Sequence, residues 1–419
     1  MAVPRFGPRR NASKTSVRTF FTRGRVLRGV VGGGVLALGL ASLITTLANV
    51  VVKVDANRAH SFAPGDGRFT AAAALQSFSA NPETELSSDQ ARLAILALKQ
   101  DATAVDALNV LALQAQLRMQ SGAVDQLFGY SFALSRRELQ PQIWTIEKAV
   151  ERGDIEQALD SYDLALKISR RAQRDLFPVL SFAIAEPVIR EMLLRRLAEK
   201  PVWAAAFLNY LSAQGRDPLA TANLLQARSI SAQVRPAHRA QVINTLVAKN
   251  LIDEAWDFYK SYRPDAARDR SRDQDFDMAV EAPSAFDWVV GRSAGLSASI
   301  SSDANGGFLD FAVPASTRAV VVSQTQLLPS GRYLLEGTSA GIDQADRSQP
   351  YWLLACRNGP EIGRVNVTNS SEMNGHFSGD FNVPSDCAIQ TLSLILRSSD
   401  KASGVSGQVE RVQLTPVRK

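Results

Sequence analysis

The sequence contains few of the residues on which metal binding and nucleophilic catalysis most often depend. Its 419 residues include three histidines and two cysteines, which are His60, His238, His376, Cys356 and Cys387. No two of them have the spacing of a zinc site, and there is no Cys-x-x-Cys pair. We therefore expect no catalytic, metal-binding or cofactor-binding residues in this chain.

Acidic side chains are absent from residues 1–28, which carry eight basic ones. The whole chain has a formal net charge of +6, so everything after this basic tail carries −2. A body that is almost neutral offers no general phosphate-binding surface. We therefore expect no nucleic-acid partner, although the sequence pI is about 9.4.

Charge of either sign is absent from residues 29–52, a run of 24 residues. About 20 apolar residues span a bilayer, and a preceding basic segment stays in the cytoplasm. A cleavable signal peptide is the alternative, but the run exceeds the usual length and no A-x-A site follows. The Ala- and Arg-rich composition is typical of bacteria. We expect a single-pass anchor in a bacterial inner membrane, with the body in the periplasm.

Glycine is scarce in residues 53–281 and frequent in residues 282–419, with 6 and 13 glycines respectively. Helices avoid interior glycine, whereas sheets with many turns use it. The change predicts an all-α part followed by an all-β part. Residues 263–281 are dense in charge and predict a solvated linker, while residues 53–86 predict a linker at 57–69 and a first helix region.

Residues 87–262 show a helical-hairpin period. Turn-like residues at Gly122, Gly153, Gly215 and Asn250 are separated by 31, 62 and 35 residues. Five residues after the last three stand small side chains, and nine residues after them stand bulky ones, which are Ala158, Ala220, Ala255, Tyr162, Leu224 and Tyr259. A small side chain lets the second helix of a hairpin cross its partner closely, and a bulky one fills the wider gap beyond.

The run Gly153-Asp154-Ile155-Glu156-Gln157-Ala158, followed by Tyr162, Ala165 and Leu166, resembles a tetratricopeptide repeat. The unit at Gly122 departs from the pattern, with Leu127 and Ser131 in place of Ala and Tyr. The resemblance implies a right-handed helical solenoid that docks a protein partner and carries no catalysis. A stack that serves only as a rigid spacer is the alternative.

Residues 282–419 alternate short apolar runs with turn residues, which predicts a β-sandwich. The predicted strands are residues 308–313, 319–322, 332–336, 351–356, 392–396 and 409–414. The segment Gln324–Leu334 predicts a hairpin that turns at Pro329-Ser330-Gly331, with Tyr333 pointing inward. This hairpin and the closing Gly407–Leu414 strand resemble those of carbohydrate-binding modules and galactose-binding-like jelly rolls. The resemblance implies a jelly roll and a polysaccharide partner. It identifies no ligand-contacting residue, and no cluster of acidic residues locates a structural calcium ion.

The two cysteines lie 31 residues apart in this exported part. An even pair there predicts a Cys356–Cys387 disulfide, and two buried free thiols are the alternative. Closing a loop of this length contributes about 3–4 kcal/mol on the chain-entropy model.

The features together predict a membrane-anchored, non-enzymatic scaffold. Its helical repeats dock a protein, its jelly roll meets glycan, and its setting is cell-envelope or exopolysaccharide assembly. An enzyme acting on envelope polysaccharide, of glycoside hydrolase or lyase type, is the alternative. A hydrolase needs a pair of suitably spaced carboxylates, and no motif marks such a pair among the 41 acidic residues.

Overall fold

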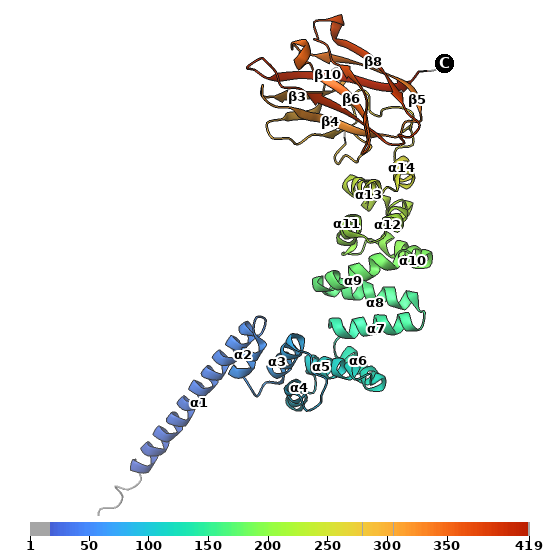
Figure 1. Cartoon of the computed structure of the whole chain (residues 1–419). Coiled ribbons are helices and arrows are strands. Elements are labelled where there is room, and N and C mark those ends of the chain that lie inside the picture. Colours follow the sequence, from blue (N-terminus) through green and yellow to red (C-terminus); the bar gives the residue numbers. More distant parts are fainter. Residues whose placement is uncertain (1–16, 279, 305, 418–419) are drawn as a thin grey trace, which may run out of the picture. The chain divides into compact units, whose positions relative to one another are not determined.

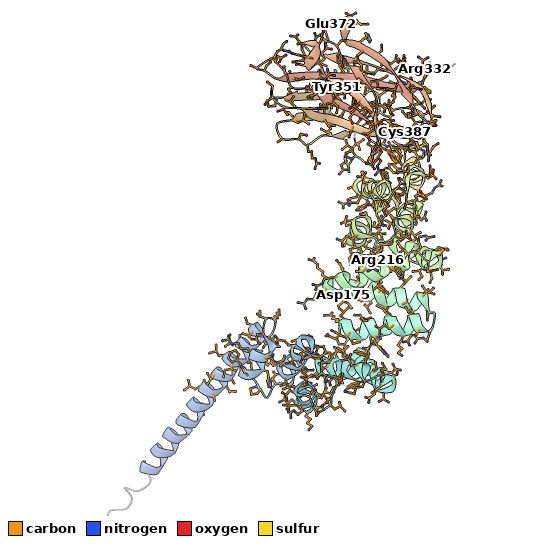
Figure 2. All side chains as sticks on the ribbon, in the orientation of Figure 1. Asp175, Arg216, Arg332, Tyr351, Glu372 and Cys387 are labelled. Atoms are coloured by element: carbon orange, nitrogen blue, oxygen red, sulfur yellow. A yellow bond between two sulfur atoms is a disulfide. The ribbon has the colours of Figure 1, made fainter. Side chains whose placement is uncertain are left out.

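A computed structural model of the chain describes residues 17–278, 280–304 and 306–417, with side chains from residue 31 onward (Figure 1). Residues 1–16 of the basic tail lie outside the described residues. The chain forms two compact units, residues 1–169 and residues 170–419. Figure 2 shows their side chains. Each unit is described by itself below.

The described part of the first unit is entirely helical. Its helices are α1 (Val17–Val51), α2 (Ala56–Phe62), α3 (Gly67–Ala80), α4 (Asp89–Gln100), α5 (Val105–Leu117), α6 (Ser121–Leu134), α7 (Leu139–Glu151) and α8 (Ile155–Ile168). Neighbouring helices pack as hairpins, with α3 against α4, α5 against α6 and α7 against α8. Alanines fill the close crossings of α3, α4 and α5, where Ala74, Ala94 and Ala107 are fully buried.

The apolar part of α1 is mostly exposed, and only its C-terminal end packs against the helices that follow it. Val31–Val51 is 21 residues long with a mean hydropathy of 1.9, enough to cross a membrane, and a signal sequence would share these features. Ala48 is fully buried against Ala59 of α2 and Phe69 of α3. The linker expected at residues 57–69 is therefore wrong, because these residues form α2 and the start of α3.

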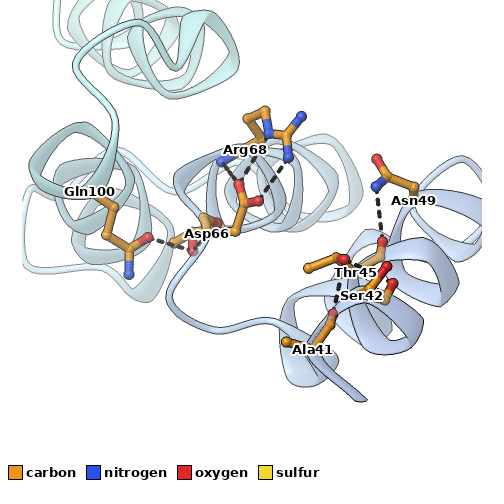
Figure 3. A network of polar contacts seen from close by, with 8 residues as sticks. Ala41, Ser42, Thr45, Asn49, Asp66, Arg68 and Gln100 are labelled. Atoms are coloured by element: carbon orange, nitrogen blue, oxygen red, sulfur yellow. Dashed lines mark hydrogen bonds and ion pairs between the residues drawn. The ribbon is translucent and has the colours of Figure 1, made fainter. Parts of the chain in front are cut away.

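Two aspartates explain why helices begin in that polar stretch. The side chain of Asp55 accepts a hydrogen bond from the Arg58 amide, and that of Asp66 accepts one from the Arg68 amide. Each satisfies an amide that the first turn of a helix leaves without a partner. Asp66 also pairs with the Arg68 guanidinium, 2.9 Å away, which lowers the pKa of Asp66 (Figure 3).

Three hairpin turns share one backbone geometry. Met119, Gly153 and Asn250 have positive φ angles of 57°, 70° and 61°. The amide after each donates to the carbonyl five residues earlier, at 3.0, 2.9 and 2.9 Å. This is the Schellman ending of a helix, which needs one left-handed residue.

The turn predicted at Gly122 is misplaced, because Gly122 lies inside α6 and the turn is at Met119. Counted from Met119, the next turn at Gly153 is 34 residues away. The positions five and nine residues on become Val124 and Phe128, and both are buried. The α5–α6 hairpin therefore fits the repeat period when it is counted from Met119 and not from Gly122.

The second unit begins with helices α9 (Arg170–Ala183), α10 (Pro187–Ala198), α11 (Ala204–Gln214), α12 (Pro218–Leu225), η1 (Arg228–Gln233), α13 (Pro236–Ala248) and α14 (Ile252–Lys260). Helix α11 packs on α9 and α13, and α13 forms a hairpin with α14. Phe177 of α9 and Phe207 of α11 meet edge to face, 5.3 Å apart.

Two five-stranded antiparallel sheets follow, in the orders β1-β4-β9-β6-β7 and β2-β3-β10-β5-β8. The strands are β1 (Val289–Val290), β2 (Ser297–Asp303), β3 (Gly306–Val313), β4 (Ala319–Gln326), β5 (Gly331–Ala340), β6 (Tyr351–Cys356), β7 (Glu361–Asn366), β8 (His376–Val383), β9 (Gln390–Leu396) and β10 (Val405–Pro416), with short η2 (Asp346–Ser348) and η3 (Met373–Gly375). The sheets bury one core between them, which includes Trp288, Trp352, Leu309 and Leu394. The architecture is the predicted helical-repeat part followed by a jelly-roll β-sandwich.

The predicted hairpin at Gln324–Leu334 is wrong, because β4 and β5 belong to different sheets. The connection crosses the edge of the sandwich, with Leu327 and Leu328 buried. Two adjacent buried leucines favour this crossing over an exposed turn. Tyr333 points inward as expected, and its hydroxyl donates to the Pro329 carbonyl at 2.9 Å.

The disulfide between Cys356 and Cys387 is present, with sulfurs 2.09 Å and Cα atoms 5.6 Å apart. It joins the end of β6 to the segment that leads into β9 (Figure 2). The bond therefore ties a 31-residue loop at one end of the sandwich.

The middle of the segment 263–281 is packed, so the solvated linker expected there is wrong for residues 271–276. The Ser271 amide donates to the Leu414 carbonyl at 3.0 Å, and the Val412 amide donates to the Gln274 carbonyl at 2.9 Å. Arg272 and Phe276 are buried. The segment lies along β10 because Ser271 and Gln274 supply backbone partners to the part of β10 that extends beyond its pairing with β3.

Candidate functional site

The outward face of β10, β5 and β8 carries a patch of polar side chains. Antiparallel register places Arg411, Thr338 and His376 in one row across these strands. The next row contains Gln413, Glu336 and Ser378. The alternate residues of the same strands point into the core, because side chains of a strand alternate between its two faces.

A hollow of about 550 Å³ opens at this patch, which we call the polar hollow. Its lining consists of Glu336, Gly337, Thr338, Asn366, Thr368, Met373, His376, Phe377, Ser378 and Arg411. Among the described residues, the Thr368 hydroxyl is buried there without a hydrogen-bond partner. A buried polar group without a partner is costly and is satisfied by a water or a ligand.

The rim of the polar hollow is a backbone turn with three left-handed residues. Met373, Asn374 and Gly375 have φ angles of 49°, 54° and 75°. A Cβ at Gly375 would lie 2.2 Å from the Ser339 carbonyl oxygen, so only glycine fits. The Ser339 hydroxyl donates to the Gly375 carbonyl at 3.2 Å. The turn is thereby fixed to β5 and holds Met373, which is 75% exposed, at the rim.

The charges of the polar hollow nearly balance. Glu336 supplies a negative charge and Arg411 a positive one. The Arg411 guanidinium also lies 3.7 Å from the Asp275 carboxylate, which is outside the hollow. Arg411 also donates to the Gln413 side chain at 3.2 Å. An arrangement with many donors and acceptors and little net charge suits hydrogen bonding to a neutral, hydroxyl-rich molecule.

The predicted repeat-packing residues are divided between the two units. Gly153, Ala158 and Tyr162 lie in the first unit, at the α7–α8 turn and on α8. Ala220, Ala255 and Tyr259 lie in the second. The three alanines and two tyrosines are buried, whereas Gly153 is exposed at its turn. Burial raises the pKa of Tyr162 to about 12. These residues build helix crossings and do not gather into one site.

Tyr259 has a second role that the repeat pattern did not show. Its hydroxyl donates to the Asp287 carboxylate at 2.8 Å, where the sandwich begins. Asp287 also accepts hydrogen bonds from the Ser284 amide and hydroxyl at 2.9 and 2.7 Å. Burial, followed by the nearby Asp287 charge, raises the pKa of Tyr259.

Arg272 completes this junction between α14 and the sandwich. Its guanidinium lies 5.5 Å from the Trp256 ring and 5.9 Å from the Phe286 ring, and it donates to the Phe286 carbonyl at 2.9 Å. Burial lowers the pKa of Arg272 to about 10. This role could not be predicted, because Arg272 stands in a charged run that is otherwise typical of a linker.

The histidines outside the hollow belong to local networks. His60 Nδ1 lies 3.1 Å from the Thr70 hydroxyl, and His238 Nε2 lies 2.7 Å from the Asn209 side-chain oxygen. Among residues 17–278, 280–304 and 306–417, no three His, Cys, Asp or Glu side chains are grouped so that they could hold a metal ion.

No protein-family model matches the sequence, and no curated protein matches it. Among solved structures, the CBM22-1 xylan-binding domain of Xyn10C from Paenibacillus barcinonensis is 11% identical, with a TM-score of 0.25 over 35% of this chain and 93% of that one. A structure described as CBM4 is 14% identical, with a TM-score of 0.25 over 35% and 99%. The pilF structure of Pseudomonas aeruginosa is 19% identical, with a TM-score of 0.25 over 47% and 93%. The scores lie below 0.5, so the proposals below rest on this chain's own residues.

Proposed function

We propose that this chain is a non-enzymatic scaffold of the bacterial cell envelope, anchored in the inner membrane by residues 29–52. Its N-terminus is cytoplasmic and its body periplasmic. The helical repeats dock a protein partner, and the jelly roll binds a glycan through the polar hollow. The setting is envelope or exopolysaccharide assembly.

The polar hollow is the observation that carries this proposal. It combines a fixed rim, an unpartnered buried hydroxyl at Thr368 and outward donors and acceptors on three strands. Sugars present hydroxyl groups in fixed directions, and a rigid sheet face positions complementary groups better than a loop does. The near balance of Glu336 and Arg411 favours a neutral glycan at this site.

Exposed apolar side chains on the helices support the docking role. Val179 and Phe182 of α9 are 53% and 65% exposed, and Val188 of α10 is 59% exposed. Val179 and Phe182 are three residues apart and therefore share a face of α9. Clustered apolar side chains on a surface are typical of protein contacts.

The glycan assignment is tested with the full chain in nanodiscs of zwitterionic lipid, titrated with neutral xylan and galactan oligosaccharides. Replacing His376 and Glu336 together with Ala is expected to raise the Kd about tenfold or more, since each hydrogen bond contributes about 1 kcal/mol. Asn382→Ala, farther along the same outward face of β8, is the matched control and should leave the Kd unchanged. Equal losses in both variants contradict the assignment.

The non-enzymatic character is tested in the same samples by following reducing ends over time. No turnover is expected. Hydrolysis that disappears when a carboxylate is replaced would favour the alternative, an enzyme acting on envelope polysaccharide.

Docking is tested by crosslinking in cells. Phe182→Ser on α9 should remove a specific crosslinked partner. Val150→Ser on α7, at a site 62% exposed, is the control and should not remove it.

A further inference from the structure

The outward face of the other sheet carries a tyrosine that is hidden by arginines. Tyr351 of β6 stands in one outward row with Ile395 and Asn366. It is nevertheless only 1% exposed. The Arg397 and Arg364 guanidinium carbons lie 4.4 and 5.1 Å from its ring centroid. Arg318 donates to its hydroxyl at 3.0 Å.

Sheet order assembles this group, which we call the arginine cluster (Arg318, Arg364 and Arg397 around Tyr351). Arg318 precedes β4, Arg397 follows β9 and Arg364 lies on β7. The order β4-β9-β6-β7 places these strands on both sides of β6. The three arginines therefore approach one ring from three strands, and Figure 2 labels Tyr351 in the sandwich.

The arginine cluster has an excess of positive charge. Arg364 pairs with Glu361 at 2.6 Å. Within the described part of the chain, neither Arg318 nor Arg397 has a carboxylate within 4.0 Å. Arg397 donates instead to the Asn366 side chain at 3.3 Å. Like charges held close together repel, so an anion bound here would be stabilised by two uncompensated guanidinium groups.

The ring of Tyr351 orients the guanidinium groups of the arginine cluster before a ligand binds. Guanidinium groups are weakly hydrated and stack on aromatic faces, which fixes their orientation before binding. Arg318 is exposed and Arg397 half-buried, so both keep donors free for solvent or ligand. A fixed guanidinium fork matches the two oxygens of a carboxylate.

The neighbouring rows of the same face supply hydroxyl groups. Ser323 pairs with Ser393, which is buried, and Thr325 pairs with Thr391, on the outward side that Tyr351 shares. Ser323, Thr325 and Thr391 are partly exposed and supply these hydroxyl groups. Guanidinium groups beside a series of hydroxyl groups suit a polymer of carboxylated sugars, because carboxylates and hydroxyl groups alternate along such a polysaccharide. We propose that this face binds an acidic polysaccharide, with its carboxylates at Arg318 and Arg397. The arginine cluster belongs to the sheet opposite β10, β5 and β8. Asn366 of β7 accepts from Arg397 and also lines the polar hollow, but the three arginines and Tyr351 do not line it, so this proposal does not depend on the function proposed there.

The test uses the full chain in zwitterionic nanodiscs, titrated with polygalacturonate, polyphosphate and neutral dextran. Polygalacturonate is expected to bind and dextran not to bind at this site. The double variant Arg318→Gln/Arg397→Gln should raise the Kd for polygalacturonate at least tenfold. Its Kd should also depend less on salt, because fewer ion contacts are lost at high ionic strength.

Two further variants keep the test decisive. Arg332→Gln/Arg216→Gln removes the same charge from exposed positions outside the arginine cluster and should leave the Kd within twofold. Tyr351→Phe keeps the ring and removes only the hydroxyl that accepts from Arg318, so a rise of about threefold is expected. Melting curves of each variant confirm that it is folded.

Equal weakening in the cluster and control variants would overturn the proposal, as would no binding of polygalacturonate or binding of polyphosphate alone. The His376→Ala/Glu336→Ala variant separates the two sites. It should lose the neutral glycan and retain polygalacturonate, so the failure of one proposal is distinguishable from the failure of the other.

Discussion

Substitution of Gly153 would measure the free-energy cost of the left-handed backbone conformation at the α7–α8 turn. Its φ angle is 70°, and a Cβ added there would meet no atom within 4 Å. Gly153→Ala therefore creates no clash, and its whole cost comes from holding an L-residue in the left-handed region. That cost is about 1–2 kcal/mol. The α7–α8 hairpin should lose this much local stability.

Gly129 is the matched control in the same unit. It lies in the interior of α6, its φ is not positive, and a Cβ there would also meet nothing within 4 Å. Gly129→Ala should stabilise α6 by about 0.5–1 kcal/mol, because glycine is a poor helix former. The same chemical change is therefore expected to have opposite signs at two positions that are both free of contacts.

Amide hydrogen exchange followed by mass spectrometry measures both effects locally. Peptides from α7 and α8 should exchange at least about fivefold faster in Gly153→Ala, and peptides from α6 more slowly in Gly129→Ala. Unchanged or slower exchange around residue 153 would refute the assignment of the turn cost to φ.

Three further outcomes are expected. Tyr259→Phe removes a hydrogen bond to the buried Asp287 and should destabilise the second unit by about 1–3 kcal/mol, measured as a lower Tm, while exchange in α5–α8 stays unchanged. The double variant Cys356→Ser/Cys387→Ser should destabilise the sandwich by about 3–4 kcal/mol, and alkylation of the native protein should find no free thiol. Burial raises the pKa of Asp273 to about 6. The folded state therefore binds this proton more tightly than the unfolded state, and the free energy of unfolding should fall as pH rises from about 4 to 6. Asp273→Asn should remove that part of the slope.

Strands with continuous apolar runs could be predicted from the sequence. The run at Tyr351–Cys356 coincides with β6, because that strand lies between β9 and β7 and most of its residues are covered. Strands β2 and β8 were missed. Ser297–Asp303 is rich in Ser and has no buried residue, and His376–Val383 carries Ser, Gly and Asn between its few buried residues. Their pairing comes from neighbours in the sheet, which local composition does not report.

The turns show a second limit of the sequence. Glycine marks left-handed positions well at Gly153, but Met119 adopts φ 57° with no residue-type signal. A left-handed conformation costs an L-residue such as methionine about 1–2 kcal/mol. The packing of α5 and α6 on either side of the turn stabilises the fold by more than this cost. The prediction therefore moved the turn to the nearest glycine, Gly122.

Both candidate binding faces depend on register and sheet order. His376 and Arg411 meet in one row only because β5 lies between β8 and β10. Arg318 and Arg397 come together because β4 pairs with β9. Neither juxtaposition has a local sequence signature, so the sequence alone predicted no ligand-contacting residue.

The junction at Arg272 has a mechanical consequence. The sandwich is tied to α13 and α14 by side-chain hydrogen bonds from Tyr259 to Asp287, from the Ala285 amide to Asn244, and from Arg357 to the Val247 carbonyl. A flexible tether would absorb tension by extending, whereas these bonds must break together before the sandwich can pivot on α14. A polymer that pulls on the sheet faces would therefore load the helix pair directly, and the second unit would transmit that load as a stiff element.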